Sequence, residues 1–200
     1  MYYGAYKNLR GSAWACFEDF KIDRLPVDIL KIARNAGVRT VRNSKLNVLD
    51  RGTSAKSFYD GKEWIIVYDD TKSKEESRYS IAHELGHIFL GHELVLTKYA
   101  GVQYFKELPV SEKQADMFAV RLLCPACVLW GLALHSAEDI AKTCLVDLSV
   151  AEKRAKRMNI LYKRNKFLTD PAEERVYMNF STYIQDCLWK RAIEEYTNKK

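Results

Sequence analysis

The chain has 200 residues, of which 48% are hydrophobic and 12% aromatic, so it can bury a core and is not generally disordered. Its 32 Lys and Arg against 26 Asp and Glu give a formal charge of +6, and no apolar stretch reaches the about 20 residues of a membrane span. The N-terminal residues lack the apolar run of a secretory signal, and five scattered Cys argue against a disulfide framework. We therefore expect a cytoplasmic protein with no membrane partner.

Helices followed by short strands are predicted in the first third of the chain. Residues 12–20 favour a short helix, and Pro26 in a first-turn position begins a second helix that Gly37 ends. Residues 38–41 and 47–49 have the composition of short strands. This part of the chain therefore mixes both kinds of structure.

The middle of the chain predicts a hairpin and then a long helix. An Asp-Gly turn signal stands at 60–61, and the β-branched and aromatic residues 64–68 predict the strand that follows it. Ser73 and Glu76 have the spacing of a capping box, which begins a helix that runs from about 74 to 90. This helix carries the residues on which the functional prediction depends.

Only helices are predicted after this point. Ser111 and Gln114 form a second capping box, which begins a helix that Pro125 ends. Residues 126–200 have helical patterns interrupted by short breaks. Because helices come first, strands next and only helices last, the sequence indicates an α+β fold.

The predicted long helix contains the motif H-E-x-x-H, at residues 83–87. Four residues along a helix advance the chain by about 6 Å and rotate it by about 40°, so His83 and His87 share one face. Two imidazoles on one face can occupy two positions around a zinc ion, and Glu84 can reach a water molecule beside the metal. The alternative is a chance match, since the motif fixes only three positions. A third ligand decides between the two.

The candidate third ligand is a glutamate on the following helix. The arrangement H-E-x-x-H-x-x-G-x-x-H is excluded, because positions 90 and 93 are Leu and Glu. Glu112 begins the next predicted helix, and Asp116 lies one turn later on the same face, where it can bind the far nitrogen of a ligating His. The alternatives are a favourable charge at a helix N-terminus for Glu112 and an exposed acid for Asp116. Because both acids occur at this spacing after the motif, we favour Glu112 as a metal ligand and Asp116 as the residue that orients a ligating His.

These motifs resemble the ImmA/IrrE family of metallopeptidases. The resemblance lies in residues 81–87, in Leu-Gly-His at 90–92 and in the run from Glu112 to Pro125, where Cys124 replaces the usual Met. It implies an α+β fold in which a thermolysin-like, gluzincin-type zinc peptidase core has a small mixed sheet and the HExxH helix. A helical C-terminal region is expected to follow this core.

The resemblance also implies the site and its function. Carried over residue by residue, it makes His83, His87 and Glu112 the ligands of one Zn²⁺ per chain, and Glu84 the catalytic acid. Such proteins relieve repression by cleaving, or enabling the cleavage of, a helix-turn-helix repressor of a phage or mobile element. The alternative function is a non-proteolytic anti-repressor that binds a repressor or DNA and holds a structural metal.

Two domains are expected, a peptidase domain at 1–130 and a helical region at 131–200 that packs on it. Residues 136–166 have the pattern of a helix-turn-helix, with a helix, a short turn and a second, basic helix. A helical hairpin with a charged outer face is the main expectation for them, and direct nucleic-acid binding is the alternative.

Substrate contacts are predicted on the strand before the HExxH helix. That strand is expected to pair with an extended peptide by strand addition, through Ile65, Ile66 and Val67. An oxyanion donor is also expected, and the sequence leaves three candidates open: Tyr99, Tyr104 and His135.

Overall fold

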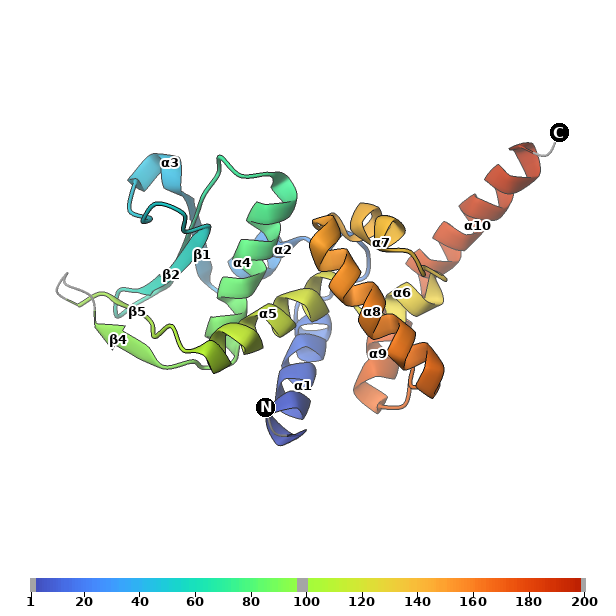
Figure 1. Ribbon diagram of the computed structural model, residues 1–200, viewed down its shortest axis with the longest axis horizontal. Coiled ribbons are helices and arrows are strands. Elements are labelled where there is room, and N and C mark those ends of the chain that lie inside the picture. The colour runs from blue at the N-terminus through green and yellow to red at the C-terminus, as the bar shows by residue number, and fades with distance from the viewer. Residues whose placement is uncertain (1–2, 97–100, 199–200) are drawn as a thin grey trace.

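A computed structural model describes residues 3–96 and 101–198 of the chain (Figure 1). The strands are β1 (Val38–Arg42), β2 (Ala55–Tyr59), β3 (Trp64–Tyr68), β4 (Leu94–Leu96) and β5 (Gln103–Phe105). The helices are α1 (Tyr3–Asp19), α2 (Ile29–Asn35), α3 (Asn43–Leu46), α4 (Lys74–Phe89), α5 (Pro109–Leu123), α6 (Ala126–Gly131), α7 (Ala137–Cys144), α8 (Leu148–Arg164), α9 (Pro171–Asn179) and α10 (Ser181–Asn198). No helix in these described ranges is long and apolar enough to cross a bilayer. The fold is α+β, as the sequence predicts.

In the described part of the chain, the strands form one mixed sheet in the order β1-β3-β2-β5-β4. β1 and β3 are parallel, and the other neighbouring pairs are antiparallel. β3 pairs with both β1 and β2 along its whole length, whereas β5 pairs with β2 only at Phe58 and Tyr59. Among the described residues, Ala55, Lys56 and Ser57 therefore leave one edge of β2 without a partner strand.

One short strand is predicted wrongly. Residues 47–49 are described and contain no strand. The Oδ1 atom of Asn43 accepts hydrogen bonds from the amides of Val48 and Leu49, at 3.0 and 3.1 Å. This local turn uses the backbone donors that a strand would need for pairing.

The start of α5 also differs from the prediction. The helix begins at Pro109, in a first-turn position that suits proline, so Ser111 lies inside the first turn instead of capping it. The hydroxyl of Ser111 donates to the carbonyl oxygen of Leu108 at 2.9 Å. Glu112 therefore lies in the first turn of α5, where the helix dipole favours a negative charge.

One buried hydrophobic cluster joins the sheet to helices from both ends of the chain. It includes Leu85 from α4, Phe118 from α5 and Met158 from α8. In Figure 1, α4 and α5 lie beside the sheet, and helices α6 to α9 gather at the far end of α5. The division into domains at 1–130 and 131–200 stays a prediction, since buried residues on both sides belong to the same cluster.

The helix that carries HExxH begins and ends at its sequence signals. Ser73 accepts a hydrogen bond from the amide of Glu76 at 3.0 Å, and the Glu76 carboxylate accepts from the amide of Ser73 at 3.3 Å. Gly91 after α4 has a φ of +64°, which glycine adopts without strain. The amide of His92 then donates to the carbonyl oxygen of His87 at 3.1 Å. This reversal brings His92 back toward His87.

Gly86 allows α5 to approach α4 closely. A Cβ atom at position 86 would lie 3.1 Å from the Cα of Ala115 and 3.1 Å from a ring carbon of Phe118. A clash with backbone cannot be relieved by rotating a side chain, so a larger residue must push the two helices apart. The spacing of α4 and α5 therefore depends on Gly86.

We expect Gly86→Val to lower the free energy of unfolding by about 1–3 kcal/mol, because it overpacks the contact between α4 and α5. The matched control is Gly11→Val in α1, where an added Cβ meets nothing within 4 Å. Valine has a higher helix propensity than glycine, so the control should not lose stability. Urea unfolding of both variants measures the difference, and equal stability of the two would contradict the close contact.

Candidate metal centre

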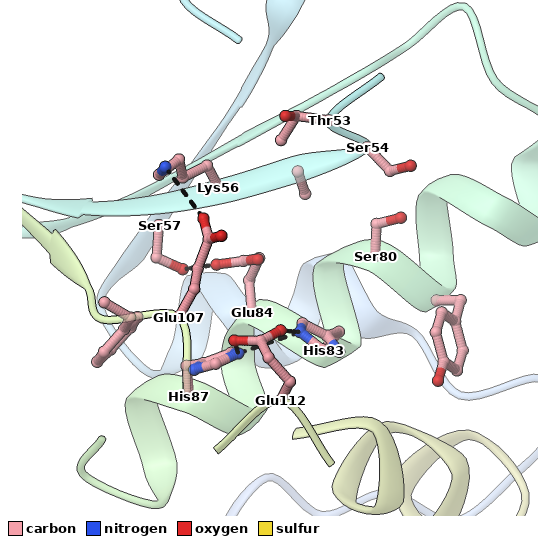
Figure 2. Close-up of a pocket in the computed structure, with 13 residues that line it drawn as sticks. Thr53, Ser54, Lys56, Ser57, Ser80, His83, Glu84, His87, Glu107 and Glu112 are labelled. Carbon is pink, nitrogen blue, oxygen red and sulfur yellow. Dashed lines mark hydrogen bonds and ion pairs between the residues drawn. The ribbon is translucent and has the colours of Figure 1, made fainter. Parts of the chain in front are cut away.

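Two histidines of α4 and one glutamate of α5 converge in a cavity beside β2 (Figure 2). The Nε2 atoms of His83 and His87 lie 3.0 Å apart. The two carboxylate oxygens of Glu112 lie 3.2 Å from Nε2 of His83 and 3.4 Å from Nε2 of His87. One ligand atom from each residue lies within 4.8 Å of the others. The structure thus brings the three predicted ligands together.

Asp116 holds the other ring nitrogen of His83. Its Oδ1 atom lies 3.0 Å from Nδ1 of His83 and accepts a hydrogen bond from the hydroxyl of Tyr79 at 2.9 Å. An ionised carboxylate only accepts hydrogen bonds, so Nδ1 of His83 carries a hydrogen and Nε2 faces Glu112. Asp116 therefore lies next to a candidate ligand, where the sequence places it.

A second chain of contacts orients His87 and includes His92 and Gln114. Nδ1 of His87 lies 2.9 Å from Nδ1 of His92, and Nε2 of His92 lies 3.1 Å from Oε1 of Gln114. The amide oxygen only accepts, so His92 donates from Nε2 and accepts at Nδ1. His87 must then donate from Nδ1, which leaves a lone pair on its Nε2. The glycine after α4 is the sequence signal that places His92 here.

The two histidines of the motif respond differently to their surroundings. Burial lowers the pKa of His83, but its hydrogen bond to Asp116 and the charges of neighbouring acids outweigh burial and raise the pKa overall. Burial lowers the pKa of His87 to about 3, with a further contribution from His83 and His92. His87 is therefore neutral near pH 7. A proton favoured at His83 occupies the place that a metal cation would take.

The donor set fits a divalent metal ion. Two imidazole nitrogens and one carboxylate are a ligand combination of catalytic zinc sites, which keep a fourth position open. Nε2 of His87 lies 3.0 Å from Nε2 of His83, a separation that suits a shared cation between the rings. Each histidine also has a partner on its second nitrogen, as metal-binding histidines usually do. His83, His87 and Glu112 are the residues that would hold the ion.

Glu84 lies beside these ligands without contacting them directly. Its carboxylate is directed toward β2, where the hydroxyl of Ser57 donates to Oε2 at 2.5 Å (Figure 2). Burial raises the pKa of Glu84, while Ser57 and His83 act in the opposite direction. A buried carboxyl with a raised pKa exchanges a proton more readily near neutral pH than an exposed one. The cavity that Glu84 lines has a volume of about 340 Å³.

Comparison with known families identifies the family of the chain. The family described as the IrrE N-terminal-like domain, peptidase family M78, matches residues 33–158. The chain belongs to this family. No curated protein matches the chain. Membership confirms the resemblance to ImmA/IrrE and supports a metallopeptidase-type function, and together with the His-His-Glu cluster it indicates a metal ion. The match passes residue 130 and ends within α8.

In this M78 family member, the strand expected to bind substrate lies inside the sheet, with both of its edges paired. β3, which carries Ile65, Ile66 and Val67, is hydrogen-bonded to β1 on one edge and to β2 on the other. A strand with both edges paired cannot accept a further peptide strand. The prediction for these three residues is therefore wrong. The sequence could not show this, because the order of strands in a sheet depends on pairing between distant segments.

The candidates for an oxyanion donor do not line the cavity where the structure describes them. Tyr99 lies outside the described residues. Tyr104 is on β5 with the ammonium of Lys56 over its ring, 4.2 Å from the centroid. His135 packs against Tyr162 in the C-terminal helices, with ring centroids 4.9 Å apart. Neither Tyr104 nor His135 is among the residues that line this cavity.

We expect His92→Ala to weaken metal binding by about 10–100-fold, because it removes the acceptor that orients His87. The matched control is His135→Ala, which removes a histidine between α6 and α7 that packs against Tyr162 and should leave metal affinity unchanged. Competition with a chelating dye measures the dissociation constant of each variant. Unchanged affinity in His92→Ala would show that His92 does not position His87.

Proposed function

We propose that this chain is a zinc-dependent endopeptidase that hydrolyses a peptide bond in a protein, namely a helix-turn-helix repressor of a phage or mobile element. The convergence of His83, His87 and Glu112, with Glu84 beside them in a cavity, carries the proposal. A structural zinc site is normally closed by four protein ligands, whereas a catalytic site has three and an open position. The three ligands among the described residues support catalysis.

Each residue of the site has a separate role in the proposed hydrolysis. A zinc ion held by His83, His87 and Glu112 would polarise the scissile carbonyl and make a water molecule more acidic. Glu84 takes a proton from the attacking water and returns it to the leaving amine, as general base and then general acid. Ser57 holds the Glu84 carboxylate in place. Asp116 keeps His83 in the tautomer that binds through Nε2.

The unpaired edge of β2 supports a peptide substrate. The amide of Asp69 donates to the carbonyl oxygen of Ser54 at 2.8 Å, so the alternation of an antiparallel ladder turns the backbone groups of Ala55 and Ser57 away from β3. Both residues line the same cavity as Glu84. An extended peptide added to this edge would pass beside the metal ligands. We therefore propose β2, in place of β3, as the strand that binds substrate.

The experiment is incubation of the metal-loaded chain with the small helix-turn-helix repressor encoded beside it, with and without a chelator, followed by mass analysis. We expect two fragments whose masses add to the intact repressor plus one water, and none with the chelator. An intact repressor that forms a stable complex would favour the anti-repressor function. Fragments that persist after complete metal removal would contradict a metallopeptidase.

A further inference from the structure

A basic cavity lies between α5 and α8, next to the metal ligands but outside the peptidase cavity. Its volume is about 350 Å³. Five cationic residues line it: Lys113, Arg121, Lys153, Arg154 and Arg157. Asp116 is the acidic residue among its lining, and its carboxylate is bonded to His83 and Tyr79. The cavity is therefore strongly positive.

A second cavity, of about 310 Å³, adjoins the first and extends its charge. The two cavities share Arg121, Arg154 and Arg157. The second adds three further cations, Arg10, Arg164 and Lys166, and one acid, Glu173. The Glu173 carboxylate accepts a hydrogen bond from the amide of Leu168 at 3.1 Å.

The arrangement of α8 makes this a cavity rather than a convex basic face. Arg154 is 6% exposed, and Arg157 is half-buried, so both point inward toward α5. The sequence predicts a charged outer face for this helix, and these two arginines differ from that expectation. A recognition helix must present its side chains outward to enter the major groove of DNA. These cations instead line a concave site of the size that binds small molecules.

We propose that the double cavity binds a small molecule carrying two or more phosphate groups, such as a nucleoside triphosphate or an inorganic polyphosphate. Arginine pairs bidentately with phosphate oxygens, and three arginines are common to both cavities. The lining of the two cavities holds eight cations and two acids, and Arg10 also pairs with Asp170 at 3.3 Å, so cations still outnumber acids, which suits a polyphosphate better than a single carboxylate. The peptidase chemistry proposed above uses none of these cations.

The test is calorimetric titration of the full, metal-loaded chain at physiological ionic strength with excess Mg²⁺. The ligands are ATP, GTP, inorganic tripolyphosphate and adenosine. We expect saturable binding of the phosphate-bearing ligands and none of adenosine. If tripolyphosphate binds as well as ATP, the phosphates alone are recognised, and if ATP or GTP binds more tightly, the base also contributes. Both results support the site.

Arg157→Gln is expected to weaken binding by about tenfold or more, since a hydrogen bond between charged groups contributes about 1.5–3 kcal/mol. The matched control is Lys156→Gln, a neighbouring exposed cation of α8 that lines neither cavity. The unfolding temperature of each variant, measured in parallel, shows that it is folded. The proposal is overturned if no phosphate ligand saturates the chain, if Arg157→Gln binds like the control, or if only a DNA duplex binds. Binding of the ligand at the metal itself would not distinguish Arg157→Gln from Lys156→Gln, because the metal cluster comprises His83, His87 and Glu112.

Discussion

Glu84→Gln is expected to leave the metal bound and to reduce peptide cleavage by about 10²–10⁴-fold, the usual contribution of a general acid–base group. Glutamine has nearly the same shape as glutamate, so the hydroxyl of Ser57 still has an oxygen to contact. The amide cannot accept the proton of the attacking water. His83, His87 and Glu112 are unchanged, so metal content and folding should be those of the wild type.

The measurement for this variant is the rate at which it cleaves the proposed repressor substrate, at equal metal content. Glu75→Gln is the matched control, since Glu75 lies in the first turn of the same helix and does not line the cavity. We expect wild-type cleavage from the control. A Glu84→Gln enzyme that cleaves at the wild-type rate would show that another group moves the proton.

Glu112→Ala is expected to remove stoichiometric metal. It deletes the one candidate ligand that α5 contributes to the cluster, leaving two histidines of α4. Loss of a ligand should cost more affinity than the about 10–100-fold typical of a residue that only orients a ligand. The variant should also lose the stabilisation that metal binding gives to the folded chain.

The measurement is metal content after dialysis, by elemental mass spectrometry. Glu107→Ala is the matched control, because Glu107 lines the same cavity but pairs with Lys56 at 3.4 Å. The control should retain about one metal ion per chain, as catalytic zinc sites of this kind do. Full metal content in Glu112→Ala would remove Glu112 from the ligand set.

The parts of the fold that depend on local signals were predictable from the sequence. The capping box at Ser73 marks the start of α4, and the glycine at 91 marks its end, as the structure shows. The spacing of His83 and His87 places them on one face of any helix, so their meeting needed no tertiary information. The position of Glu112 was harder to predict, because its approach to the two histidines depends on the packing of α5 against Gly86.

What the sequence did not provide depends on contacts between distant segments. Three-residue strands such as β4 and β5 are too short to show a pattern, and they form because each has a neighbour to pair with. The same limit explains why the sequence does not show that β3 is a central strand with both edges paired. The inward turn of Arg154 similarly depends on where α8 packs, which its own composition does not reveal.

The most direct measurement is anomalous diffraction at the zinc edge from crystals of the chain grown with zinc. We predict one anomalous peak per chain, bounded by Nε2 of His83, Nε2 of His87 and the carboxylate of Glu112, with the Glu84 carboxylate nearby but outside bonding distance. A peak elsewhere, or no peak among these three residues at full zinc content, would contradict the proposed metal centre and the hydrolytic function that rests on it.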